Sequence, residues 1–377
     1  MSTFHLFSWG ANSHGQLGQN IEDEQLVLPT EVDLSQAELR AENIVKIVGG
    51  AGLTLILDKL GDVYSCGWNT KGQTGIPVAG SILKFKEIEY LRNEYIIDVA
   101  CGWDSSMALT RDGYAFVWGS NRFGQLGNDL CEKQDTVKPI KITSNKKIVR
   151  CSMGLRHSAY VTEDGLIFVT GSNSKGQLGV ISPKGKQISM LTTFTRVPGL
   201  TDVVDVACGQ HHTVVATREG IYSWGSNKYG QLGHDSVENT IPFPKRIQNI
   251  QPEYTKVYAG WTHTVTLNRN GDVLNWGRNI YGQLGGQRSD QDHWKPKSIQ
   301  NLPKIKELGI GSEHNIALTE DRSIICWGWN EHGNCGNGST ENILIPENVS
   351  TLRDFNGVVI GAGAGHSFAV IQKCPPR

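Results

Sequence analysis

Five histidines recur along the chain at a spacing that raises the question of metal binding or acid–base catalysis. Each ends a copy of a short motif, G-x-x-H, and successive copies are 51 to 55 residues apart; the five are His157, His212, His263, His314 and His366. In two further copies Leu53 and Ser105 occupy that position. A metal site needs three or more ligands that converge on one point, whereas a side chain that recurs once per repeat lies in a different structural unit each time. We therefore expect structural histidines, each hydrogen-bonded through its imidazole to the backbone.

The residue just before this histidine position changes from copy to copy while its neighbours repeat. In chain order it is Gly52, Asp104, Arg156, His211, Thr262, Glu313 and Gly365. Variation at one position of a fixed scaffold is where binding chemistry can be placed. We therefore predict that Asp104, Arg156, His211 and Glu313 contact a partner protein.

The tryptophans divide into a repeated set and a smaller irregular set. Five of them begin W-G motifs, and their regular recurrence predicts packing between adjacent units; these are Trp9, Trp118, Trp224, Trp276 and Trp327. Outside that pattern, Trp103 and Trp261 follow the glycine that opens G-x-x-H, and Trp294 lies in a polar connection, 286–297. Because tryptophan and arginine dominate the binding energy of protein interfaces, we predict these three as partner-binding residues. A second long polar connection, 180–201, is a further candidate for binding.

The positions of these residues follow from repetition along the whole chain. Copies of W-G-x-N-x-x-G-Q-L-G, some of them imperfect, start near residues 9, 66, 118, 170, 224, 276 and 327. Each unit holds several short apolar runs separated by glycine turns, and it is too long for a leucine-rich or ankyrin repeat. It fits a four-stranded propeller blade. The sequence therefore predicts an all-β fold, a seven-bladed β-propeller that forms a single domain over residues 1–377.

One repeat predicts the strands of a blade, and the two chain ends predict how the ring closes. Strands are expected at 138–142, 148–153, 157–162 and 166–170, with a tight hairpin turn at Asp164-Gly165. The equivalent turn at Asp321-Arg322 lacks glycine, and we expect it to be wider. The last G-x-x-H copy has no return strand after it, while residues 4–9 form a return strand with no partner before it. Pairing 367–371 with 4–9 would complete the seventh blade and leave no open edge.

Composition and motif searches exclude several function classes. The 36 Lys and Arg nearly balance the 37 Asp and Glu, which argues against binding of nucleic acid or anionic lipid by overall charge. No run approaches the roughly 18 to 20 apolar residues that span a bilayer, so we expect a soluble intracellular protein. The 8 cysteines show neither C-x-x-C nor zinc-ligand spacing, which indicates reduced, buried thiols. Phosphate-loop, nucleophile-elbow and H-E-x-x-H motifs are absent, so we expect no cofactor, no metal and no covalent catalysis.

The paired motifs, W-G-x-N-x-x-G-Q-L-G and G-x-x-H-[ST] followed by a [DEN]-G turn, resemble the regulator of chromosome condensation family of seven-bladed propellers over essentially the whole chain. Segments such as CGWDSSMALT, AGWTHT and WGWNEHGNCG are similar to its secretion-regulating guanine nucleotide exchange factor branch. The resemblance implies a regulator of a small GTPase in secretion, present in cytoplasm and nucleus. Asp104 or Glu313 would then attract the GTPase's phosphate-site lysine, and Arg156 its acidic switch residues. Arg156 stands where the chromosome-condensation relative carries an acidic residue, and Thr262 where it carries a histidine.

Three other readings of a propeller remain open at this point. The first is a scaffold without exchange activity that recruits a trafficking or ubiquitin-pathway partner. The second is a chromatin-binding propeller, which the balanced charge and the lack of a basic tail disfavour. The third is a plant-type light sensor, which would need several G-W-R-H copies where only GWTHT and GLRHS come near. In each case we expect a monomer that acts by protein–protein contact.

Overall fold

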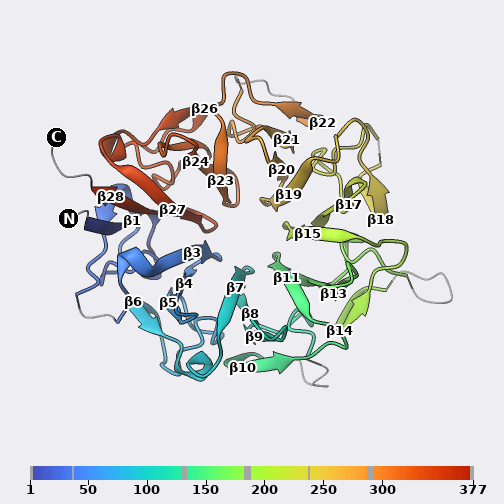
Figure 1. Cartoon of the computed structure of the whole chain (residues 1–377), viewed down its shortest axis with the longest axis horizontal. Helices are drawn as coiled ribbons and strands as arrows, with labels where there is room; N and C mark the ends of the chain where they lie inside the picture. The colour runs from blue at the N-terminus through green and yellow to red at the C-terminus, as the bar shows by residue number, and fades with distance from the viewer. Residues whose placement is uncertain are drawn as a thin grey trace.

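The computed structural model describes residues 3–35, 38–128, 134–181, 188–236, 238–286 and 292–373. In these ranges the chain forms seven four-stranded antiparallel sheets, arranged as the blades of a ring around a central axis (Figure 1). The predicted seven-bladed propeller is thus confirmed. Each blade is named below by its inner strand, the strand nearest the axis.

The inner strand of each blade lies at the axis, and the second strand pairs with it. The inner strands are β3 (Ile44–Gly49), β7 (Ile96–Cys101), β11 (Ile148–Met153), β15 (Val203–Cys208), β19 (Tyr254–Ala259), β23 (Ile305–Ile310) and β27 (Asn356–Ala362). The second strands are β4 (Leu53–Asp58), β8 (Ser105–Thr110), β12 (His157–Thr162), β16 (His212–Thr217), β20 (His263–Asn268), β24 (His314–Thr319) and β28 (His366–Lys373). Every residue of the second strands from β4 to β24 is buried, because neighbouring blades cover both faces of the strand.

The outer two strands complete each sheet. The third strands are β5 (Val63–Gly67), β9 (Ala115–Gly119), β13 (Ile167–Ser172), β17 (Gly220–Ser226), β21 (Val273–Gly277), β25 (Ile324–Gly328) and β1 (Thr3–Ala11). The outer strands are β6 (Ile82–Glu87), β10 (Thr136–Ile142), β14 (Met190–Arg196), β18 (Thr240–Arg246), β22 (His293–Ser298), β26 (Ile343–Asn348) and β2 (Gln25–Glu31). Proline occurs in five of these outer strands, in β2, β10, β18, β22 and β26, where the missing N–H discourages pairing with another chain.

The helices of the described chain are three single 3₁₀ turns, η1 (Ala41–Asn43), η2 (Glu89–Leu91) and η3 (Ser350–Leu352). None of them is long enough to cross a bilayer.

The two ends of the chain share one blade, as the sequence predicts. Strand β1 pairs with β28 from Thr3 opposite Lys373 to Gly10 opposite His366, and it pairs with β2 on its other side. Figure 1 shows the two termini side by side at this blade. The ring is therefore held closed by hydrogen bonds between the first and the last strand.

Two expectations about chain segments need correction. The repeat seen in the sequence is offset from the blade, because the strand predicted at 138–142 is β10, which pairs with β9 of the preceding blade rather than with β11. The two long connections, 180–201 and 286–297, contain the outer strand β14 and all but the last residue of β22. A short polar strand at the rim has no continuous apolar run, so the sequence pattern did not reveal it.

The turn at Asp321-Arg322 is not wider than its equivalents. Arg322 takes a left-handed conformation with φ 67°, and Gly165 has φ 74° at the same position. In both turns the N–H of this residue donates to the carbonyl three residues earlier. Only this one residue of each pair has a positive φ, so arginine occupies a position that favours glycine.

We predict that a chain lacking residues 1–11 loses the cooperative unfolding of the ring. The deletion removes β1, leaves β28 and β2 without their shared partner, and takes away the fully buried Trp9. The expected result, measured by circular dichroism on heating, is a Tm lower by more than about 10 °C or no transition at all. A chain ending at Gln372 is the control, since it loses only the terminal Thr3 and Lys373 pair. Equal Tm values for the two chains would show that closure does not stabilise the ring.

Candidate functional site

The strand topology places both repeated motifs on one face of the ring. The G-x-x-H turns join each inner strand to the second strand, and the W-G loops join the third strand to the outer strand. Because the strands are antiparallel, both connections lie at the same end; we call this end the loop face. The hairpin turns between second and third strands form the opposite end, the hairpin face.

The repeated histidines are fully buried and link neighbouring blades. In each case Nε2 lies 2.9 or 3.0 Å from a side-chain oxygen of the next blade; the pairs are His157–Thr213, His212–Thr264, His263–Asn315, His314–Ser367 and His366–Thr54. The prediction of a bond from imidazole to backbone is therefore wrong about the acceptor. The backbone is reached one step later, because the Thr213 hydroxyl donates to the Gln177 carbonyl at 2.7 Å.

The hydrogen bond from Thr213 to the Gln177 carbonyl determines which nitrogen of His157 carries the proton. The Thr213 hydroxyl has one proton and gives it to the Gln177 carbonyl, so His157 must donate from Nε2–H. Its Nδ1 has no hydrogen-bond partner among the described residues. Burial lowers the pKa of four of these imidazoles to about 3; the four are His157, His212, His314 and His366. They are therefore neutral near pH 7, and no group of metal-binding side chains forms in the described ranges.

The glycine that opens G-x-x-H makes room for the imidazole. A Cβ on Gly209 would lie 2.1 Å from Cε1 of His212, and one on Gly260 would lie 2.2 Å from Cε1 of His263. Any larger residue would displace the ring from its position between the blades. The motif is thus explained by packing and hydrogen bonding.

Trp103 and Trp261 meet across the axis of the ring. Their ring centroids lie 5.1 Å apart, although they belong to the β7 and β19 blades, which are not neighbours. Both are half-buried. A cavity of about 90 Å³ on the axis is lined by both tryptophans, by the ends of six inner strands and, at the β27 blade, by Gly363 and Ala364 of the turn that follows the strand. The two rings therefore sit at the centre of the loop face, partly packed and partly open to solvent.

Arg156 and His211 lie close together on the loop face. Arg156 is exposed, and its guanidinium carbon lies 4.3 Å from the ring centroid of Phe123. His211 is half-buried, and its pKa is lowered by burial and then by the charges of Arg156 and Lys175. These side chains belong to neighbouring blades, β11 and β15.

The two acidic candidates are less available than the sequence suggested. Glu313 is only 5% exposed, and its carboxylate accepts hydrogen bonds from Thr262 Oγ1 at 2.6 Å and Gln283 Nε2 at 2.7 Å. Asp104 is half-buried, and burial raises the pKa of its carboxyl. The Glu313 carboxylate therefore links two neighbouring blades of its own chain.

Trp294 lies away from the other candidates, on the outer strand β22 at the rim. Its backbone packs closely against Gly230, since a Cβ added to that glycine would lie 2.9 Å from the Trp294 Cα.

The six described cysteines are free thiols, four of them buried. Cys131 and Cys374 lie outside the described residues.

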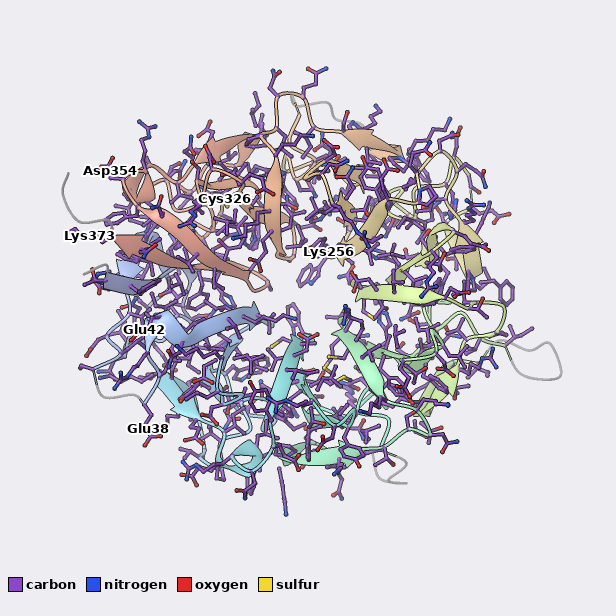
Figure 2. All side chains as sticks on the ribbon, viewed as in Figure 1. Glu38, Glu42, Lys256, Cys326, Asp354 and Lys373 are labelled. Atoms are coloured by element: carbon purple, nitrogen blue, oxygen red, sulfur yellow. The ribbon has the colours of Figure 1, made fainter. Side chains whose placement is uncertain are left out.

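A belt of charges in the channel escaped the sequence analysis. The same register position of six inner strands carries alternating signs in Lys46, Asp98, Arg150, Asp205, Lys256 and Glu307, and the seventh strand has Val359 there. Lys46 forms an ion pair with Asp98, and Figure 2 shows Lys256 beside the central opening. Burial raises the pKa of Asp205 to about 6, opposed by the Val257 N–H and Arg150. Aligning the third residue of the first six inner strands would have revealed the charges of this belt.

The geometry defines a closed seven-bladed propeller whose loop face carries the side chains that vary between repeats. The RCC1-like domain family model matches residues 5–370, and the chain belongs to this family. It is homologous to the secretion-regulating guanine nucleotide exchange factor of Mus musculus, with 36% identity over 97% of this chain and 83% of the mouse protein. The same protein of Bos taurus is 33% identical over the same shares. The solved structure of yeast RCC1 (Prp20) bound to Kap60 has the same fold, with TM-score 0.86 and 22% identity, covering 100% of this chain and 90% of that one.

We predict that His212→Ala destabilises the ring while His211→Ala does not. His212 is fully buried and loses both its packing and its bond to Thr264; we expect a loss of about 2 to 4 kcal/mol in the free energy of unfolding. His211, its neighbour in sequence, is half-buried and should cost less than about 1 kcal/mol. Chemical denaturation measures both. Similar losses for the two variants would contradict the assigned structural role of His212.

The buried imidazoles also predict how stability depends on pH. In the unfolded chain they bind protons below about pH 6.5, whereas in the folded chain four of them have a pKa of about 3. The unfolded state therefore binds more protons in this window, and stability falls as the pH is lowered through it. His212→Gln should reduce the slope of unfolding free energy between about pH 4 and 6 by about 1.4 kcal/mol per pH unit. An unchanged slope in denaturation series at several pH values would mean that His212 is not kept neutral by the fold.

Proposed function

We propose that this propeller binds a small GTPase on its loop face and promotes release of the bound guanine nucleotide, in regulated secretion and in the cytoplasm and nucleus. Support comes from the homology over 97% of the chain to a secretion-regulating guanine nucleotide exchange factor. The observation that carries the proposal is the position of the variable side chains. Trp103, Arg156, His211 and Trp261 are accessible on one face of a rigid ring.

Nucleotide exchange by such a face needs no covalent step. A surface that binds the nucleotide-free GTPase more tightly than the loaded form shifts the equilibrium toward release, by the difference between the two affinities. The half-exposed Trp103 and Trp261 would provide apolar anchors. Arg156 would form charge-assisted hydrogen bonds with carboxylates of the GTPase. No residue here need contact the nucleotide itself.

A second function, a scaffold without exchange activity, is favoured by one observation. The acidic side chains expected to attract a lysine of the GTPase are not freely exposed, since Glu313 is bonded within its own chain and Asp104 is half-buried. A face without a free carboxylate at these positions could bind a trafficking or ubiquitin-pathway partner and leave any nucleotide in place.

The test is release of labelled GDP from a panel of purified small GTPases. For a GTPase that responds, we expect Trp103→Ala and Arg156→Ala to slow the stimulated release by about tenfold or more, with Tm changes below about 3 °C. Leu60→Ala, a 60% exposed residue in a hairpin-face turn, should leave release unchanged. Stable binding without faster release for every GTPase tested would replace exchange by scaffolding. Loss of activity in Trp294→Ala alone would move the site to the rim.

A further inference from the structure

Part of the loop face, from the β11 to the β19 blade, carries four cationic side chains, and two of them stack on aromatic rings of the preceding blade. The Arg156 guanidinium lies over Phe123, and the Arg278 guanidinium lies 4.7 Å from the Tyr229 centroid. Lys228 lies 5.1 Å from the same Tyr229 ring, and Lys175 is exposed between β13 and β14. We call Arg156, Lys175, Lys228 and Arg278 the basic arc. Stacking across blade junctions holds the two guanidinium groups in place before any partner binds.

The cations of the basic arc have no ion-pair partner in the described part of the chain. This differs from the same face at the β3 blade, where Lys71 pairs with Asp135 at 3.0 Å. Burial lowers the pKa of His211 first, and the charges of Arg156 and Lys175 lower it further, which places His211 within range of both cations. Asp292 lies near enough to Arg278 for their charges to interact, but the two form no ion pair, so the arc is a mainly positive surface on a chain whose formal net charge is -1.

The stacked geometry selects the chemistry of the ligand. A guanidinium lying flat on a ring keeps the N–H donors at its edge free for bidentate bonds with carboxylate or phosphate. Single-stranded nucleic acid uses open aromatic faces for base stacking, but here the arc's own cations cover Phe123 and Tyr229. Carboxylates of a protein need no such stacking surface.

We propose that the basic arc binds an acidic segment of the partner protein, with Arg156 and Arg278 as its two fixed anchors. This inference deepens the proposed function and rests on it, because it names the chemistry by which the loop face recognises its partner. The segment lies along neighbouring blades β11, β15 and β19, and its glutamate or aspartate side chains pair with the four cations.

The experiment uses a fluorescent, glutamate-rich peptide of about twelve residues as the probe, titrated with the full chain at about 50 and about 300 mM NaCl. We expect binding that weakens with salt, and a loss of about 20-fold or more in affinity for the double variant Arg156→Glu, Arg278→Glu. The matched control is Arg111→Glu. Its guanidinium stacks on Tyr95 at 3.3 Å, but it lies on the hairpin face, so its substitution should change the affinity by less than about twofold.

Several results would overturn the inference. These are no binding of the peptide, equal loss in the double variant and the control, or tighter binding of duplex DNA or phosphatidylserine vesicles than of the peptide through the same two arginines. A dimer in sedimentation that the double variant dissociates would assign the arc to a second copy of this chain. If no GTPase releases GDP faster but the peptide result holds, the proposed function fails and the basic arc stands. If a GTPase releases GDP equally fast with the wild-type chain and with the double variant, the proposed function stands and the role of the basic arc fails.

Discussion

The structure depends on one backbone carbonyl in each W-G loop. At all seven blade junctions this carbonyl accepts a hydrogen bond from a side chain of the next blade; the pairs are Thr54–Gln16, Ser106–Gln73, Ser158–Gln125, Thr213–Gln177, Thr264–Gln231, Asn315–Gln283 and Ser367–Asn334. At five junctions the indole N–H of a W-G tryptophan donates to the same carbonyl. A carbonyl buried between blades would be costly if left unpaired. Each blade therefore satisfies a buried carbonyl of its neighbour. At the Asn334 carbonyl the two donors, Trp9 and Ser367, lie on β1 and β28 and come together only because these strands share a sheet.

The number seven has its own electrostatic consequence. Opposite charges can alternate around a ring only when the number of positions is even, since an odd ring forces one pair of like charges together. The channel belt contains six alternating charges and one valine, Val359, in the β27 blade. That blade is also the one closed by the two chain ends. An apolar residue there removes the like-charge contact, which in a partly buried channel would be unfavourable.

The sequence could predict the propeller because each local signal pointed to the same unit. The W-G tryptophans and the glycine of G-x-x-H are required by contacts that every blade makes, so they repeat. The acceptor of the histidine bond could not be predicted, because Thr213 lies one blade away and pairs with His157 only after the ring has formed. Likewise, the sequence alone suggests that Glu313 is an exposed acid in a turn. Its burial could not be predicted, because it depends on Thr262 and Gln283 from the preceding blade.

On the loop face, the backbone of the variable position stabilises the ring, whereas in some blades its side chain is available for binding a partner. The backbone carbonyl of each variable residue is bonded in every blade, as in the bond from Ser172 N to Arg156 O at 2.8 Å, so the scaffold is indifferent to the side chain there. Where the residue is glycine, as at Gly52, the neighbouring loop packs over it. A Cβ added to Gly52 would lie only 2.7 Å from the His14 ring. Where the side chain is long and cationic, as in Arg156, it stacks on the neighbouring ring and stays exposed. The repeat therefore sets the position of the turn, and the size and charge of one residue decide which blades present a binding group to a partner.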